Sequence, residues 1–132
     1  MFTTHVTSRE RVELIDMTDE VHRAIVAAGV NEGTALVFTP HTTAAITINE
    51  NADPDVCRDI CMELNKVIPF EDGYRHMEGN SAAHLKSCLV GASEQLIVTG
   101  GRPLLGTWQG VYFCEFDGPR RRQVHIQVLG AS

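Results

Sequence analysis

The sequence contains no long hydrophobic segment. No apolar run approaches the roughly 20 residues needed to cross a bilayer, and the opening segment MFTTHVTSRER has no apolar signal core. We therefore expect no membrane span, no export and a cytoplasmic protein. Linkers, repeats and low-complexity tracts are also absent, and 132 residues suffice for one hydrophobic core but not for two. These absences predict a single domain over residues 1–132.

Common cofactor motifs are missing as well. Neither G-x-x-x-x-G-K-[ST] nor a strand-linked G-x-G-x-x-G occurs, so a P-loop or a Rossmann site is not supported, and there is no H-E-x-x-H. The four cysteines form no C-x-x-C pair. We expect all four to be reduced, buried packing residues, because free cysteine behaves as a small hydrophobic residue.

Positive charge is scarce. Eleven Lys and Arg residues face seventeen Asp and Glu residues, and the net charge of −6 argues against a broad surface for nucleic acid or anionic membranes. The exception is the run Arg120-Arg121-Arg122. Three arginines can serve one small phosphate ligand without forming a nucleic-acid surface, although a solvated strand entrance would show the same pattern.

Capping residues and hydrophobic periodicity define the expected elements. They predict three helices, over residues 18–29, 53–66 and 80–91, with Leu85, Cys88 and Leu89 facing inward on the third. Alternating or strand-rich segments predict six or seven strands, and residues 117–119 form a short connection typical of an antiparallel hairpin. The expected fold class is α+β, a largely antiparallel β-sheet or sandwich flanked by about three helices.

Three of the six histidines stand at positions that favour a metal site. His41 follows a buried strand and Pro40, His76 lies in the loop before the third helix, and His84 lies about one turn inside that helix. Three neutral imidazoles and one open position would form a zinc site of the catalytic type. We therefore expect a divalent metal at these histidines, with Zn²⁺ first and Mg²⁺ or Mn²⁺ as alternatives.

Carboxylates lie beside these histidines. Asp53 and Asp55 are explained as helix caps, whereas Glu50, Glu78 and Asp117 have no such simple role. Each of the latter three can orient a ligating histidine, bind a hard cation or act as an acid or base. We take them as the candidate catalytic residues.

Arginines near the last strand are candidates for phosphate recognition. Arg120 and Arg122 are in phase with the apolar residues that follow, so they lean toward the core side at the mouth of the strand. The alternative is that they pair with Glu115 or Asp117. Trp108 and Gln109, between two glycines, could supply a stacking wall and an amide.

Three blocks become recognisable when they are taken together: HTTAAITINENADPD, HMEGNSAAHLKSCLVG and LGTWQGVYFCEFDGPRRRQV. In this order and spacing they resemble the family of small trimeric proteins that includes the secondary thiamine-phosphate synthases. The likeness spans nearly the whole chain. It implies a sandwich-like α+β fold, a homotrimer and a polar pocket near a subunit interface that contains His41, His76 and His84 with Glu50, Asp53, Glu78, Asn80, Asp117, Arg120 and Arg122 nearby.

The resemblance also implies an activity. A thiamine-phosphate synthase joins hydroxymethylpyrimidine diphosphate to thiazole phosphate and releases pyrophosphate. Such a step needs positioning and charge neutralisation on the leaving group, which a metal ion with Arg120 and Arg122 would supply. Two alternatives remain: a metal-dependent hydrolase of a phosphorylated small molecule, and a non-catalytic trimeric protein that binds a metal or a metabolite.

Overall fold

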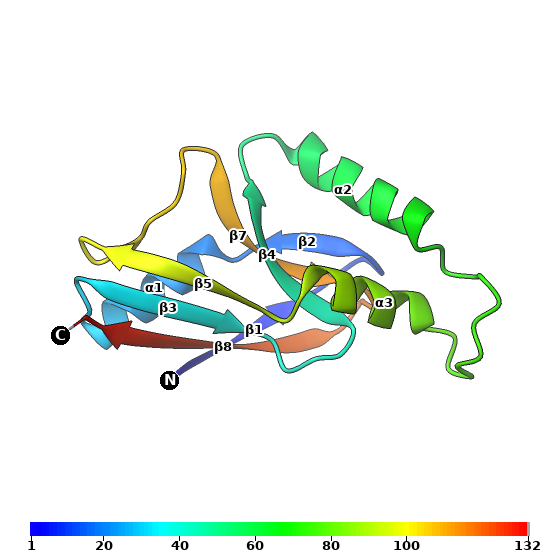
Figure 1. Ribbon diagram of the computed structural model, residues 1–132, viewed down its shortest axis with the longest axis horizontal. Helices are drawn as coiled ribbons and strands as arrows, with labels where there is room; N and C mark the ends of the chain where they lie inside the picture. The colour runs from blue at the N-terminus through cyan, green and yellow to red at the C-terminus, as the bar shows by residue number, and fades with distance from the viewer. Residues whose placement is uncertain (132) are drawn as a thin grey trace.

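The computed structural model describes residues 1–131, which form two antiparallel sheets and three helices (Figure 1). The larger sheet has the strand order β1 (Phe2–Thr7), β8 (Arg121–Gly130), β3 (Gly33–Phe38), β5 (Ser93–Thr99) and β6 (Arg102–Pro103). The smaller sheet has the order β2 (Glu13–Asp16), β7 (Gln109–Glu115) and β4 (Ala44–Glu50). All neighbouring strands are antiparallel, which confirms the α+β class.

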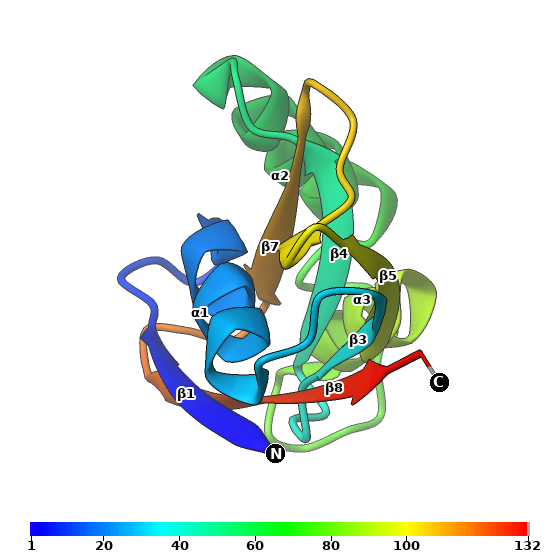
Figure 2. The same ribbon diagram turned by 90° about the vertical axis from the view of Figure 1, so that its left-hand side faces the viewer.

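Helix α1 (Thr18–Ala28) fills the space inside the curl of the two sheets (Figure 2). Its Val21 and Ile25 are fully buried in one cluster with Val37 and Val124 of the larger sheet and Phe113 of the smaller one. The three layers therefore share one apolar core. Burial of side chains of this size contributes roughly 1.5–3 kcal/mol each, which makes this cluster the main stabilising element.

The start of α2 and the end of α1 follow from their capping residues. Asp53 caps α2 (Pro54–Val67), because its side chain accepts a hydrogen bond from the Asp55 N–H at 2.9 Å. Helix α1 ends at Gly29, whose φ of 67° is the left-handed conformation that glycine adopts without strain. Thr18 is the first residue of α1 rather than its cap, and its N–H and hydroxyl both donate to Asp16.

The large apolar side chains of helix α3 (Ser81–Val90) are exposed to solvent. The prediction that Leu85, Cys88 and Leu89 face inward is therefore wrong. Leu85 and Leu89 are 46% and 64% exposed, and Cys88 is exposed too. Three of the four residues on the buried face are small, because the helix packs closely on β4, where the Ser87 hydroxyl donates to the Ala44 carbonyl at 2.6 Å. This buried face consists of Ala82, Ala83, Lys86 and Ser87.

Helix α2 packs loosely on the outer face of the smaller sheet. None of its residues is buried, so the apolar stripe expected there is only half-buried. A cavity of about 230 Å³ is lined by Ile60 and Leu64 of the helix and by Leu14 and Cys114 of the sheet. No helix among residues 1–131 is long and apolar enough to cross a membrane.

Residues 117–119 connect the two sheets, so the predicted hairpin is wrong. Strand β7 pairs with β2 and β4, whereas β8 pairs with β1 and β3. A side chain larger than that of glycine would not fit in this connection, because a Cβ atom on Gly118 would clash with the Glu10 carbonyl oxygen. The chain therefore turns a tight corner here and enters the second sheet.

A buried ion pair spans this corner. Arg122 is 2% exposed and Glu115 is 0% exposed, and the guanidinium contacts both carboxylate oxygens. Arg122 also donates to the Thr43 hydroxyl at 2.8 Å, while the Ser8 hydroxyl donates to Glu115 at 2.7 Å. The predicted alternative, pairing of Arg122 with Glu115, is thus confirmed.

The carboxylate of this pair is stabilised in its charged form. Burial by itself raises the pKa of Glu115, but hydrogen bonds from Arg122, Ser8 and the Asp117 N–H outweigh it, and the pKa is lowered. A lowered folded-state pKa adds stability above the ordinary value of 4.5, and this contribution is lost as the pH falls below it.

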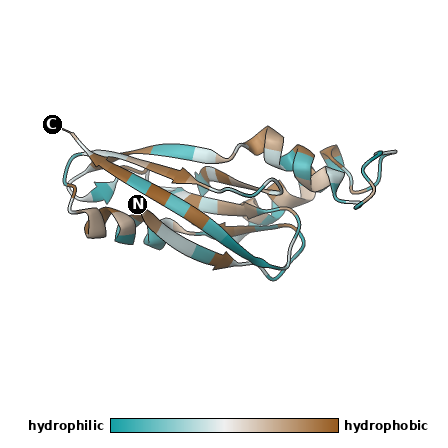
Figure 3. Ribbon diagram, turned by 90° about the horizontal axis from the view of Figure 1, so that it is seen from below, coloured by the Kyte–Doolittle hydropathy of each residue, from teal (hydrophilic) through white to brown (hydrophobic). Residues whose placement is uncertain are grey.

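The outer face of the larger sheet is partly apolar. Hydrophobic and hydrophilic residues alternate along β8, the long strand that ends at the C-terminus (Figure 3). Leu36, Phe38, Ile97 and Leu129 remain exposed on this sheet. An exposed apolar surface of this kind is a usual feature of protein–protein contacts.

Replacing Glu115 by Gln should lower the free energy of unfolding by about 3 kcal/mol, because Arg122 would keep a buried charge without a counter-charge. Urea denaturation at pH 7 measures this difference. Glu10→Gln, an exposed substitution with the same change in charge, should stay within about 0.5 kcal/mol of the wild type. Equal effects of the two substitutions would contradict the importance of the pair.

Candidate functional site

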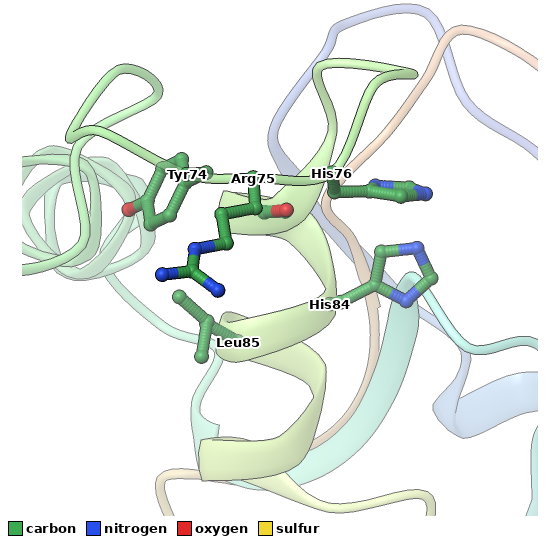
Figure 4. Close-up of a pocket in the computed structure, with 6 residues that line it drawn as sticks. Tyr74, Arg75, His76, His84 and Leu85 are labelled. Atoms are coloured by element: carbon green, nitrogen blue, oxygen red, sulfur yellow. The ribbon is translucent and has the colours of Figure 1, made fainter.

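The loop before α3 brings two histidines together. The His76 carbonyl accepts a hydrogen bond from the Gly79 N–H, and Gly79 has a φ of 77°, so the chain reverses immediately before the helix. The rings of His76 and His84 then lie with centroids 5.5 Å apart and planes at 82°. Figure 4 shows the two imidazoles facing each other across this turn. The expected meeting of His76 with His84 is confirmed.

A polar cavity of about 380 Å³ adjoins these imidazoles at the N-terminal end of α3. Its surface consists mostly of polar atoms, and it combines two hydroxyl groups with cations, carboxylates and imidazoles. The first turn of a helix leaves backbone N–H groups without intrahelical partners, which favours an anion nearby. We call it the polar cavity; its lining residues are Thr42, Thr43, His76, Glu78, Asn80, His84, Asp117, Arg120 and Arg122.

Asp117 organises one wall of the polar cavity. Its carboxylate accepts hydrogen bonds from Asn80 Nδ2 at 2.9 Å and from the Arg120 guanidinium at 3.1 Å. The Arg120 Nε also donates to the Asp117 carbonyl at 3.0 Å. The predicted alternative, pairing of Arg120 with Asp117, is confirmed. A guanidinium carries five N–H donors, and three of those of Arg120 have no partner within residues 1–131.

Asn80 offers the cavity an unused acceptor. Its Nδ2 is held by Asp117, so the amide orientation is defined by a carboxylate that only accepts. Its Oδ1 is buried and has no hydrogen-bond partner among the described residues. A buried acceptor of this kind is costly when unpaired, so a ligand that presents an N–H or O–H group would be favoured.

Two cations hold the loop that carries His76. Phe70 lies between Arg11, whose guanidinium carbon is 3.7 Å from the ring centroid, and Lys86, whose Nζ is 4.3 Å from it. Lys86 is fully buried and donates to Asn65 Oδ1 at 2.6 Å. Burial, and secondarily the charge of Arg11, lowers the pKa of Lys86. These contacts connect α2, α3 and the intervening loop.

His41 does not join the other two histidines. It lies in the connection between β3 and β4, and its Nε2 accepts a hydrogen bond from the Gln123 N–H at 2.9 Å. It does not line the polar cavity. Burial and the positive charge of Arg122 lower the pKa of His41, so its neutral form is favoured.

The expected metal site is therefore not formed within one chain. Among residues 1–131, no group of three or more His, Cys, Asp or Glu side chains is placed to hold a metal ion. The Nε2 lone pair of His41 is already used by the backbone of β8. The residues present do not fit a zinc, magnesium or manganese centre of the kind expected from His41, His76 and His84.

The remaining candidates lie at the opposite end of the smaller sheet. In the β4–β7 register, Ala44 opposes Glu115 beside the polar cavity, whereas Glu50 opposes Gln109 at the far end. Six residue steps along a strand span about 20 Å. Trp108 is 62% exposed just before β7. The structure thus separates Glu50, Asp53, Trp108 and Gln109 from the polar cavity.

Sequence reasoning missed the hydroxyl groups of the cavity. Thr42 and Thr43 line it, and Thr43 also binds the buried Arg122. Their position directly after His41 was the available signal, but threonines in a strand-rich segment are ordinary. Tyr74, which lines an adjoining cavity, has no signal in the sequence because its place depends on the folded loop.

Comparison with known proteins places the chain in a family. Residues 2–131 match the family described as UPF0047 protein YjbQ-like. UPF0047 protein YugU of Bacillus subtilis is 54% identical over 129 residues, covering 97% of this chain and 98% of that protein. A UPF0047 protein of Methanocaldococcus jannaschii is 49% identical, with 98% and 94% covered.

The chain belongs to the UPF0047 YjbQ-like family. The crystal structure of an uncharacterised conserved protein of this family from Clostridium acetobutylicum has a TM-score of 0.96 and 50% identity, covering 98% of this chain and all of that one. A hypothetical protein from Aeropyrum pernix has a TM-score of 0.93 at 35% identity, with 98% of both chains covered.

These relatives correct the predicted identity. The assignment to the secondary thiamine-phosphate synthase family is wrong, because the match is to an uncharacterised family that is distinct from thiamine-phosphate synthase. The predicted synthase and transferase activity is therefore withdrawn. The physical reason is that the three blocks are features of the fold that the family shares, and a shared fold does not specify an activity.

The His41 hydrogen bond predicts a pH dependence. The folded-state pKa of His41 lies below 6.5, so the unfolded chain binds more protons than the folded chain just below that pH. The free energy of unfolding therefore decreases as the pH decreases. His41→Gln removes this proton uptake. The wild-type advantage in free energy of unfolding over this variant should therefore shrink between pH 8 and pH 5.5 in urea titrations. A constant or growing advantage would contradict the assignment.

Proposed function

We propose that this member of the UPF0047 YjbQ-like family binds a small phosphorylated molecule in the polar cavity. The observation that carries the proposal is the placement of Arg120, with free guanidinium donors, beside the N-terminal end of α3 and two imidazoles. Guanidinium forks and helix N-termini are the usual partners of phosphate in proteins.

The charges around the cavity support a ligand with mixed polarity. Arg122 forms an ion pair with Glu115, and Arg120 forms an ion pair with Asp117. Glu78 also lines the cavity, as an exposed carboxylate. A fully anionic ligand would meet repulsion from Glu78, whereas a phosphate that also carries a hydroxyl or amine would find an acceptor there.

Asn80 supports the same ligand chemistry. Its buried Oδ1, which has no partner among the described residues, can accept a hydrogen bond and would repel a bare phosphate oxygen. The phosphate is therefore expected on the side of Arg120 and the imidazoles, with a donor group of the ligand turned toward Asn80. Because the two ends of the ligand meet different partners, the cavity would fix the orientation of the ligand as well as bind it.

The two imidazoles give the site a chemical capability beyond binding. A neutral imidazole donates through one nitrogen and accepts through the other, so the adjacent rings of His76 and His84 can donate to a phosphate and take up a proton from it. Glu78 and Asp117, the carboxylates predicted as catalytic, lie in the same cavity. Their acid or base role stays a prediction.

Three further expectations stay predictions. They are the divalent metal, the homotrimer and the cytoplasmic location. The exposed apolar residues Leu36, Phe38, Ile97 and Leu129 offer a surface that self-association would cover. A metal would have to be supplied with the ligand or with a second chain, since the ligand set is incomplete here.

Arg120→Gln should weaken binding of inorganic phosphate and pyrophosphate by about tenfold, because one charge-assisted hydrogen bond contributes roughly 1.5–3 kcal/mol. Isothermal titration calorimetry at low ionic strength measures both affinities, with and without added zinc. Arg121→Gln removes the same charge from the adjacent exposed residue, which does not line the cavity, and should change affinity less than about twofold.

Two outcomes would overturn the proposal. One is the absence of phosphate and pyrophosphate binding under all conditions. The other is an equal loss of affinity in both variants, which would mean that the effect comes from net charge alone.

A further inference from the structure

A second cavity of about 420 Å³ adjoins the polar cavity, and the two share His76 and His84. We call it the apolar cavity, because its surface consists mostly of apolar atoms; it is lined by Tyr74, Arg75, His76, Ser81, His84 and Leu85. The imidazole pair therefore stands between two compartments of opposite polarity. A single ligand that contacts both rings can reach into both.

We infer that the bound molecule is a phosphate monoester that carries an apolar group, with that group seated in the apolar cavity beside Tyr74 and Leu85. This inference rests on the proposed function, because the phosphate is placed in the polar cavity. It adds the chemical class of the group to which the phosphate is attached.

Tyr74 provides a preformed wall for this group. Its hydroxyl donates to the Pro69 carbonyl at 2.7 Å, which closes the loop on itself and orients the ring. The same loop is held by Phe70 between its two cations. Because the wall is already ordered, ligand binding has little conformational entropy to overcome there.

Leu85 forms the opposite wall. It is 46% exposed, although the next residue of the helix, Lys86, is fully buried. A single exposed leucine is ordinary, but this one lines the same cavity as Tyr74, next to a polar site. Covering it with an apolar ligand group would remove that surface from water.

Arg75 completes the apolar cavity. Figure 4 shows its guanidinium beside Leu85 and the Tyr74 ring, on the side away from the two imidazoles. No hydrogen bond or ion pair of this side chain is formed within residues 1–131. A planar guanidinium stacks well on an aromatic or other flat face, so a ring is the apolar group that this cavity suits best.

The volumes agree with a ligand of metabolite size. Small-molecule sites usually measure about 300–1,000 Å³, and each cavity alone reaches the lower part of that range. Both cavities are open to solvent, so a phosphate monoester can enter without a movement of the fold.

Phenyl phosphate and methyl phosphate are suitable probes because both are monoesters with the same charge. The wild type should bind phenyl phosphate about tenfold more tightly than methyl phosphate, as expected for partial burial of one ring. Leu85→Ala should reduce this ratio to about threefold or less while the affinity for methyl phosphate stays the same. Leu89→Ala, one turn further along α3 and outside the cavity, should keep the wild-type ratio.

Calorimetry with both probes on four proteins, the wild type and the Leu85→Ala, Leu89→Ala and Tyr74→Ala variants, separates the possible results. Equal affinities of the wild type for the two probes would overturn the inference and leave the proposed function standing. A preference for phenyl phosphate that persists in Leu85→Ala and in Tyr74→Ala would also overturn it, because the ring would then bind elsewhere. Failure of both probes to bind would overturn the proposed function and the inference together.

Discussion

Two opposite charges, those of Arg122 and Glu115, are buried where the ends of the two sheets meet. Such a pair is stable only when its remaining donors and acceptors are also satisfied. Ser8 and Thr43 meet this condition from two other segments of the chain. The pair therefore holds the end of β7 and the start of β8 together with two distant segments, and it stabilises the corner that the chain turns after β7.

The polar cavity depends on this arrangement. The Asp117 N–H donates to Glu115, which fixes the corner from which the Asp117 side chain reaches Asn80 and Arg120. Asn80 in turn begins α3, and α3 carries His84. The buried carboxylate of Glu115 thus fixes the backbone of Asp117 through one hydrogen bond, and the Asp117 side chain in turn orients Asn80 and Arg120.

Local features were predictable from the sequence because their physical causes are local. Asp53 before Pro54 determines where α2 begins, and Gly29 determines where α1 ends. The proximity of His76 and His84 followed from helix geometry and a short loop. The pairing of Arg122 with Glu115 was one of two alternatives, and the phase of Arg122 with the apolar residues of β8 already indicated its burial.

Other features depend on tertiary contacts that sequence periodicity does not contain. The leucines of α3 predicted the wrong buried face, because close packing on β4 selects small side chains and buries Lys86 against Asn65 and Phe70. The expected single site was divided because the length of β4 places Glu50 far from Thr43. His41 does not join His76 and His84, because its Nε2 accepts a hydrogen bond from the Gln123 N–H of β8.

The most direct test of the account is a crystal soaked in tungstate, a phosphate mimic with a strong anomalous signal. We expect an anomalous peak in the polar cavity, within hydrogen-bonding distance of Arg120 and the N-terminal end of α3. The peak should disappear in Arg120→Gln crystals and remain in Arg121→Gln crystals. No peak in the polar cavity of the wild type, or peaks only at other surface arginines, would contradict the account.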